Sequence, residues 1–149
     1  MKPIAEWKFH YYRLVLCFKS MTKINKNGFR FDFDSSACQE CAALCCRGES
    51  GKIWVNHLEI ENICKFLSIN SIDLVQKYLY KINNRYSIKE RLRLDDYECV
   101  FLTEGEQKSC SIYPVRPQQC QTFPFWDYYK RSKNQLLQDC PGVRFSCIF

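Results

Sequence analysis

The chain has 149 residues, the length of a single domain, and it is globular in composition, with 46% hydrophobic and 26% charged residues. A domain of this size buries roughly 68–70% of its unfolded surface, so its core does not by itself require a metal or disulfide staple. The formal net charge is +6, but the basic residues are scattered, which argues against specific binding of nucleic acid. Without a repeat, low-complexity segment or Pro/Gly-rich linker, residues 1–149 are expected to form one domain.

The first 20 residues, MKPIAEWKFHYYRLVLCFKS, are aromatic and basic, and a helix is expected near residues 7–18. Their longest apolar run, LVLCF, is too short for the 7–15-residue core of a secretory signal. Nothing in the chain approaches the 18 or more apolar residues of a membrane span. We therefore expect a cytoplasmic protein without a membrane partner, in a compartment where thiols stay reduced.

Two helices are predicted in the middle of the chain, after a loop at residues 25–28 and a short strand at residues 53–55. Asn56, with Glu59 three residues later, is close to a capping box and predicts the start of the first helix. A second helix is expected to start at Ser71 or Asp73 and to end at residues 83–84. Each helix carries apolar residues at positions i, i+3, i+4 and i+7, typical of a buried stripe: Ile60, Ile63, Cys64 and Leu67, then Val75, Tyr78, Leu79 and Ile82.

From Tyr86 to Leu94 apolar residues alternate with polar ones, which indicates strands. A turn is expected at residues 95–96, followed by a hairpin of strands 97–102 and 110–113. Pro117 suits the first turn of a short helix through Cys120, and residues 127–137 are predicted to be helical. The predicted fold class is α+β, a small single domain with helices packed on a minor antiparallel hairpin or sheet.

Eleven cysteines stand out, four of them within the stretch CQECAALCC. The spacing of Cys38 and Cys41 lets both sulfurs face one tetrahedral ion, although thiol–disulfide exchange uses the same spacing. Adjacent side chains diverge in helices and strands, so Cys45 and Cys46 are not expected to bind one mononuclear ion together. In a reducing compartment such clusters more often bind metal or react than cross-link.

The second half of the chain supplies the segments ECVFL and CSIYPVRPQQCQTFPFW and a late CPG. Together with CxxCxxxCC, they resemble the YkgJ-like cysteine-cluster (CxxCxxCC) family over about residues 31–142, with residues 1–30 as an N-terminal extension. The family motif has one residue fewer before its Cys-Cys pair. Members are thought to chelate zinc or iron, sometimes as an iron–sulfur cluster. The resemblance implies eight metal-binding thiols, enough for one site or two: Cys38, Cys41, Cys45, Cys46, Cys99, Cys110, Cys120 and Cys140.

Arg116 matches the RP of the same family and is expected beside the site, either donating hydrogen bonds to thiolates or pairing with a carboxylate such as Glu59. The leading hypothesis is a cytosolic protein that binds zinc or iron, with the metal ion as its partner and any protein partner unknown. The alternative is an iron–sulfur redox protein or a component of a protein-modification enzyme system. No residue is assigned a catalytic role, and the sequence leaves open whether the protein is an enzyme.

A register prediction follows for the 97–113 hairpin. If opposed residue numbers sum to an odd value, with Cys99 facing Ile112, then Cys99 and Cys110 share one face of the hairpin and are diagonal neighbours. A slip by one residue sends Cys110 to the other face. Cys64 is expected in the helical core, away from the other cysteines, because it belongs to the buried stripe of its helix.

Overall fold

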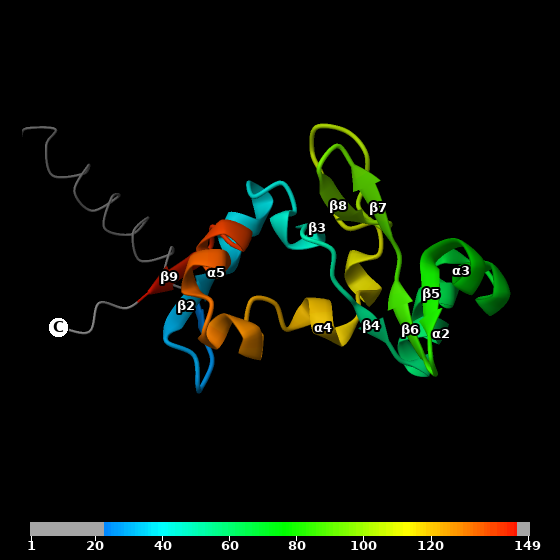
Figure 1. Cartoon of the computed structure of the whole chain (residues 1–149), viewed down its shortest axis with the longest axis horizontal. Coiled ribbons are helices and arrows are strands. Elements are labelled where there is room, and N and C mark those ends of the chain that lie inside the picture. Colours follow the sequence, from blue (N-terminus) through cyan, green and yellow to red (C-terminus); the bar gives the residue numbers. More distant parts are fainter. Residues whose placement is uncertain (1–22, 146–149) are drawn as a thin grey trace, which may run out of the picture.

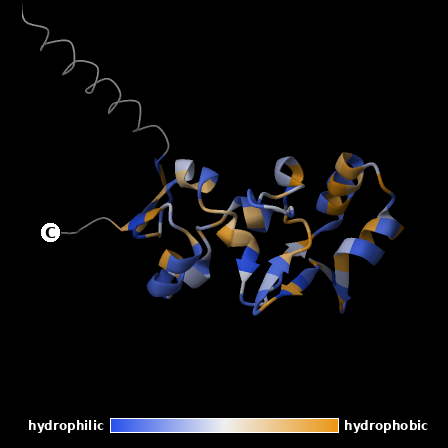
Figure 2. Ribbon diagram, turned by 90° about the horizontal axis from the view of Figure 1, so that it is seen from above, coloured by the Kyte–Doolittle hydropathy of each residue, from blue (hydrophilic) through white to orange (hydrophobic). Residues whose placement is uncertain are grey.

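The computed structural model describes residues 23–145, so the helix predicted at residues 7–18 lies outside the described residues. Within residues 23–145 there are four α-helices, several short 3-10 helices and three small antiparallel sheets of three strands each. The predicted α+β class is therefore confirmed. Figure 1 shows these elements strung along one long axis. In Figure 2 the apolar residues are spread along this axis rather than gathered at one centre.

One end of the molecule, which we call the aliphatic region, is a β-sheet covered by two helices. Strands β4 (Trp54–Val55), β6 (Arg85–Ile88) and β5 (Leu79–Ile82) pair in that order, and helices α2 (His57–Leu67) and α3 (Ser71–Tyr78) lie beside them. The core of this region consists mainly of aliphatic side chains: Val55, Ile60, Ile63, Leu74, Leu79, Ile88, Phe101 and Ile112.

Helix α2 begins as its sequence predicts. Asn56 accepts a hydrogen bond from the Glu59 N–H, and Glu59 accepts one from the Asn56 N–H, which is a complete capping box. Helix α3, however, ends at Tyr78, so the predicted continuation to residues 83–84 is wrong. Leu79 is already extended and starts β5. The hydrogen bonds of β5 to β6, closed by a turn with Asn83 in the left-handed conformation, replace those of another helical turn.

The other end, which we call the aromatic region, joins parts of the chain that are distant in sequence. Its sheet has the order β1 (Lys23–Asn25), β2 (Phe31–Asp34) and β9 (Val143–Phe145). The helix predicted at residues 127–137 is split into the 3-10 helix η5 (Asp127–Lys130) and α5 (Lys133–Asp139), because Ser132 leaves the helical conformation between them. Buried core residues here are Phe31, Phe33, Tyr129, Leu136, Cys140 and Val143, with Phe29, Phe123, Phe125, Trp126 and Phe145 packed against them.

Between the two regions lie the third sheet, β3 (Arg47–Gly48), β8 (Asp96–Cys99) and β7 (Glu90–Arg93), and helix α4 (Gln118–Gln121). The turn between β7 and β8 falls at residues 94–95, one residue before the predicted position. The predicted 97–113 hairpin is not formed as two strands. Its first strand ends at Cys99, where the Leu102 N–H donates to the Cys99 carbonyl oxygen. In place of the second strand, predicted at residues 110–113, Cys110 forms an isolated bridge, residues 111–112 form a turn, and the 3-10 helix η4 (Tyr113–Val115) begins at Tyr113.

Candidate metal centre

The first four of the eight predicted ligands follow β2 on a segment that contains two 3-10 helices, η2 (Ser35–Gln39) and η3 (Leu44–Cys46). Asp34 caps η2 by accepting hydrogen bonds from the backbone N–H and the hydroxyl of Ser36. Ala42 and Ala43 both have positive φ angles, 51° and 55°. Left-handed backbone is unfavourable for alanine, and two such residues in succession reverse the chain between Cys41 and the Cys45–Cys46 pair.

The sulfurs of Cys45 and Cys46 lie close together, which the sequence did not predict. Their Sγ atoms are 4.0 Å apart. Two sulfurs bound to one tetrahedral zinc ion at about 2.3 Å lie roughly 3.8 Å from each other, so this pair has nearly the spacing of two ligands of one ion. The expectation that neighbouring side chains diverge is wrong here, because Cys46 ends a short 3-10 turn rather than continuing a helix or strand.

The other four cysteines come from separate elements in the second half of the chain. Cys99 ends β8, Cys110 forms an isolated bridge with Leu102, Cys120 lies in α4, and Cys140 follows α5. Cys99 and Cys110 pack against the aliphatic core, whereas Cys140 is a buried member of the aromatic core. The cysteines therefore reach from one hydrophobic core to the other.

The predicted register of Cys99 and Cys110 is wrong. Leu102 faces Cys110, and these numbers sum to an even value. The two thiols are nevertheless neighbours, since each adds to the electrostatic environment that Cys46 and Cys120 experience. The turn after Cys99 breaks the strand, so the alternation of faces no longer carries through to Leu102.

Seven of the eight predicted ligands form one electrostatically linked set, because each is Cys45, interacts with Cys45, or interacts with a cysteine that does so. Burial, followed by repulsion from Cys99, Cys110 and Cys45, raises the pKa of Cys120 to about 12. Burial is also the main cause that raises the pKa of Cys140 to about 11, and Cys38, Cys41 and Cys45 add to this rise. The eighth, Cys41, enters the group through its action on Cys38 and Cys140. The eight cysteines therefore form one electrostatic cluster.

Cys64 lies outside this cluster, as predicted. It is part of α2 and packs against the aliphatic core. Partial burial raises its pKa, and the charged group that adds to the rise is Glu61 of its own helix rather than a thiol.

Arg116 is a cation that acts on several thiols of the cluster, whereas Arg91 acts on Cys99. Burial raises the pKa values of Cys110 and Cys120, and the Arg116 guanidinium opposes both rises. The guanidinium lies 3.8 Å from the centre of the Tyr113 ring, and its buried Nε has no hydrogen-bond partner among the described residues. A pair with Glu59 is not formed in the part of the chain that the structure describes. A partly buried cation whose buried Nε has an unused donor is suited to an anionic neighbour.

Glu59 and Gln119 fix the position of α4, and with it Cys120. Glu59 accepts a hydrogen bond from the Gln118 N–H in addition to its role in the capping box. The Gln119 side chain accepts from the Trp54 N–H and donates to the Lys52 carbonyl oxygen, which fastens α4 to the start of β4. The sequence did not predict these roles, since a glutamine carries no local signal for such contacts.

The sulfur atoms of the described cysteines do not surround one common position. Within residues 23–145, no three His, Cys, Asp or Glu side chains are placed to hold one metal ion together. Beside the cluster lies a cavity of about 390 Å³, whose wall includes Cys45, Cys46, Cys99 and Cys120. The side chains of these cysteines thus have room to turn toward a common centre.

The family model of the CxxCxxCC domain, described as a putative zinc- or iron-chelating domain, matches residues 37–141. The chain belongs to the CxxCxxCC family. All eight cysteines of the cluster lie inside the CxxCxxCC match, and so does Cys64, whereas Cys17 and Cys147 lie outside it. No solved structure matches the chain. None of the helices in residues 23–145 has the length and apolar character needed to cross a membrane.

Proposed function

We propose that the protein chelates zinc or iron in the cytoplasm through the thiolates of the cysteine cluster, and that the bound metal joins the aliphatic and aromatic regions. The observation that most supports this proposal is where in the sequence the thiols of the cluster come from. They come from five separate segments of the chain, yet they act on one another electrostatically, and Arg116 acts on several of them.

The chemistry of the donor set fits a thiophilic metal. Thiolates accept zinc, iron and iron–sulfur clusters alike, and metal binding requires them to lose their protons. Four thiolates on a divalent ion leave a charge of about −2. Arg116, whose buried Nε lacks a partner among the described residues, can donate to such a sulfur and offset part of this charge.

A structural role for the metal follows from the energies. Apparent binding free energies of structural zinc sites are about 10–16 kcal/mol, comparable with the whole stability of a domain, about 5–15 kcal/mol. A metal held by thiols from both regions would therefore contribute a free energy comparable with the net stability of the whole domain.

Metal analysis of the protein purified without oxygen tests the proposal. We expect zinc or iron in a fixed ratio to protein. Cys38→Ser should lose metal and much of the thermal stability together, whereas Cys64→Ser, its control outside the cluster, should keep its metal. A Cys38→Ser protein with full metal content and an unchanged Tm would exclude Cys38 as a ligand.

An iron–sulfur cluster is the second candidate, and the cavity beside the thiols favours it. Four thiols border a space of about 390 Å³, which is larger than a single ion needs. Such a cluster can serve a redox protein or one component of a protein-modification system. The two candidates differ in colour: a zinc protein is colourless, whereas an iron–sulfur protein is brown and bleaches with dithionite.

A further inference from the structure

A second candidate site lies in the aromatic region, and no cysteine of residues 23–145 lines it. It is a hollow of about 690 Å³ between the loop after β1, the 3-10 helix η5, α5 and the end of β9. Ligand pockets commonly have volumes of about 300–1,000 Å³. The lining residues are Asn25, Gly28, Phe29, Arg30, Phe31, Tyr129, Lys130, Lys133 and Phe145.

The charges around this hollow all have one sign. Arg30, Lys130 and Lys133 line it, and no acidic side chain does. Lys130 forms an ion pair at 2.7 Å with Asp127, whose carboxylate is 88% exposed and outside the lining. The hollow therefore attracts anions, and a ligand with several negative charges can contact three cations at once.

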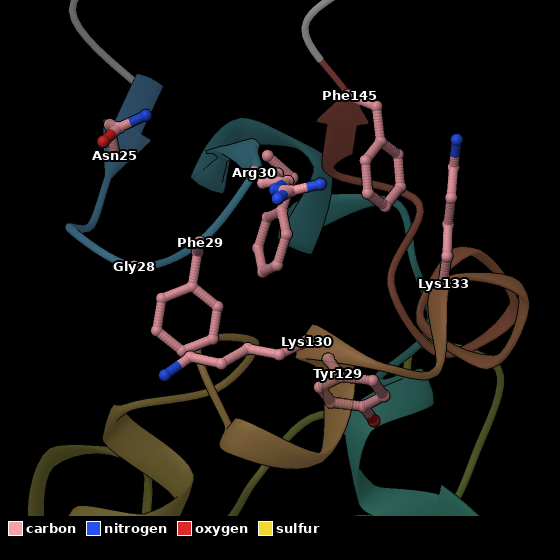
Figure 3. Close-up of a pocket in the computed structure, with 9 residues that line it drawn as sticks. Asn25, Gly28, Phe29, Arg30, Tyr129, Lys130, Lys133 and Phe145 are labelled. Carbon is pink, nitrogen blue, oxygen red and sulfur yellow. The ribbon is translucent and has the colours of Figure 1, made fainter.

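Two of these cations lie against aromatic rings, Lys130 in addition to its ion pair with Asp127. The Lys130 amine lies 4.8 Å from the centre of the Phe29 ring, and the Lys133 amine lies 4.3 Å from the centre of the Phe145 ring. Figure 3 shows these pairs on either side of the hollow, with Arg30 between them. Cation–π contacts at exposed sites are weak, so the amines can leave the rings for a phosphate.

The rings then become available for a flat apolar group. Phe29 and Phe145 are only partly buried, and both are held by edge-on contacts with Phe31, at centroid distances of 5.5 Å and 5.9 Å. Gly28, with φ of 86°, makes the left-handed turn that precedes Phe29. Rigid aromatic walls next to clustered cations match a ligand that is anionic at one end and aromatic at the other.

We propose that this hollow binds a mononucleotide, with its phosphates held by Arg30, Lys130 and Lys133 and its base against Phe29 or Phe145. Base–aromatic stacking tolerates any base, so the proposal concerns the class of ligand and not one nucleobase. A single strand of nucleic acid fits less well, because these cations surround one hollow and do not line a groove. No cysteine of the cluster lines the hollow, so the proposed ligand does not contact the thiols proposed to bind metal.

Calorimetric titration of the full-length, metal-loaded protein with ADP tests this. We expect saturable binding that weakens as salt rises. Arg30→Gln and Lys133→Gln should each weaken it roughly tenfold, the effect of losing one charge-assisted hydrogen bond. Phe145→Leu should weaken ADP binding but not pyrophosphate binding. Lys81→Gln, an exposed lysine of β5 in the aliphatic region, is the matched control and should change nothing.

Three results would overturn the proposal. The first is no saturable ADP binding at millimolar concentration. The second is pyrophosphate binding as tight as ADP binding, which would leave the rings without a role. The third is tighter binding of a short single-stranded oligonucleotide than of ADP with the same dependence on Arg30 and Lys133, which would identify a polymer site.

Discussion

The aliphatic and aromatic regions reach stability in different ways. The strands and the two capped helices of the aliphatic region come from one continuous stretch, residues 54–88, and Phe101 and Ile112 complete its mainly aliphatic core. The aromatic region has shorter elements, and it combines a strand from the start of the described chain with one from its end.

This difference shows where the cysteine cluster matters most. Short strands and single helical turns supply few backbone hydrogen bonds of their own, and closing a long loop costs conformational entropy. The aromatic region has both disadvantages, and one of its buried core residues, Cys140, is a proposed ligand. We therefore expect the aromatic region to depend on the metal and the aliphatic region to persist without it.

Removing the metal should produce the largest difference in stability between the two regions. After treatment with a strong chelator under reducing conditions, the amides of β2 and β9 should lose their protection from hydrogen exchange, while those of α2 keep most of theirs. The binding energy at stake is about 10–16 kcal/mol for a structural zinc site. Hydrogen-exchange mass spectrometry measures both sets of amides in one sample. Equal loss in both regions would contradict the comparison.

Shortening one buried side chain in each core should show more clearly how the two regions differ in stability. Ile63 and Leu136 are both completely buried, in the aliphatic and aromatic cores respectively. Changing either to Ala should cost about 2–5 kcal/mol in the metal-loaded protein, measured by denaturant unfolding. In the metal-free protein, Leu136→Ala should leave the aromatic region without measurable protection, whereas Ile63→Ala should add its destabilisation to a region that still folds. Identical behaviour of the two variants would argue for one cooperative unit.

The pH dependence of the metal-free protein should come from the buried thiols. Burial raises the pKa of Cys99 to about 11 and that of Cys120 to about 12, from an ordinary value of 9.0. The folded chain then holds more protons than the unfolded chain above pH 9, so its stability should fall as pH rises from 9 toward 12, by at most about 1.4 kcal/mol per pH unit for each thiol.

Melting temperatures of metal-free and metal-loaded protein between pH 8 and 10 test this expectation. Ligand thiolates in the loaded protein have already lost their protons, so its Tm should change less over this range. A metal-free protein whose Tm is constant up to pH 10 would rule out the thiols as the cause.

The smallest effect should come from the capping box of α2. Asn56→Ala removes the side chain that accepts the Glu59 N–H and should cost about 1 kcal/mol. The loss should appear in the stability of the aliphatic region, with metal content unchanged. Lys65→Ala, an exposed position near the end of the same helix, is the control and should have little effect. A loss of metal in Asn56→Ala would show that the two regions are coupled through α2.

Local signals in the sequence predicted the aliphatic region well and the aromatic region poorly. The cap and the apolar stripe of α2 are contained within a dozen residues, and both are confirmed. The end of α3 was missed because Leu79 and Ile82 fit a helical stripe as well as an alternating strand, and only the pairing with β6 decides between them. The pairing of β2 with β9 has no local signal at all.

For the candidate site, the sequence suggests which cysteines to consider, and their role as ligands stays a prediction, but it says little about their geometry. Which cysteines to consider followed from their spacing and from a family resemblance, and the family itself is confirmed. The close approach of the Cys45 and Cys46 sulfurs depends on a turn with two left-handed alanines, which residue preferences do not predict. The electrostatic effect of Cys38 on Cys140 depends on the assembly of the aromatic region as a whole.

The pairing of β2 with β9 also sets an order of events during synthesis. Residues of the aliphatic region leave the ribosome together and can fold at once, whereas β2 must wait for β9, more than a hundred residues later. At a synthesis rate of about 5–20 residues per second, this wait is on the order of 5–20 s. Throughout that time Phe31 and Phe33 have no completed sheet to cover them. The nascent chain therefore exposes apolar side chains on β2 that a chaperone can recognise.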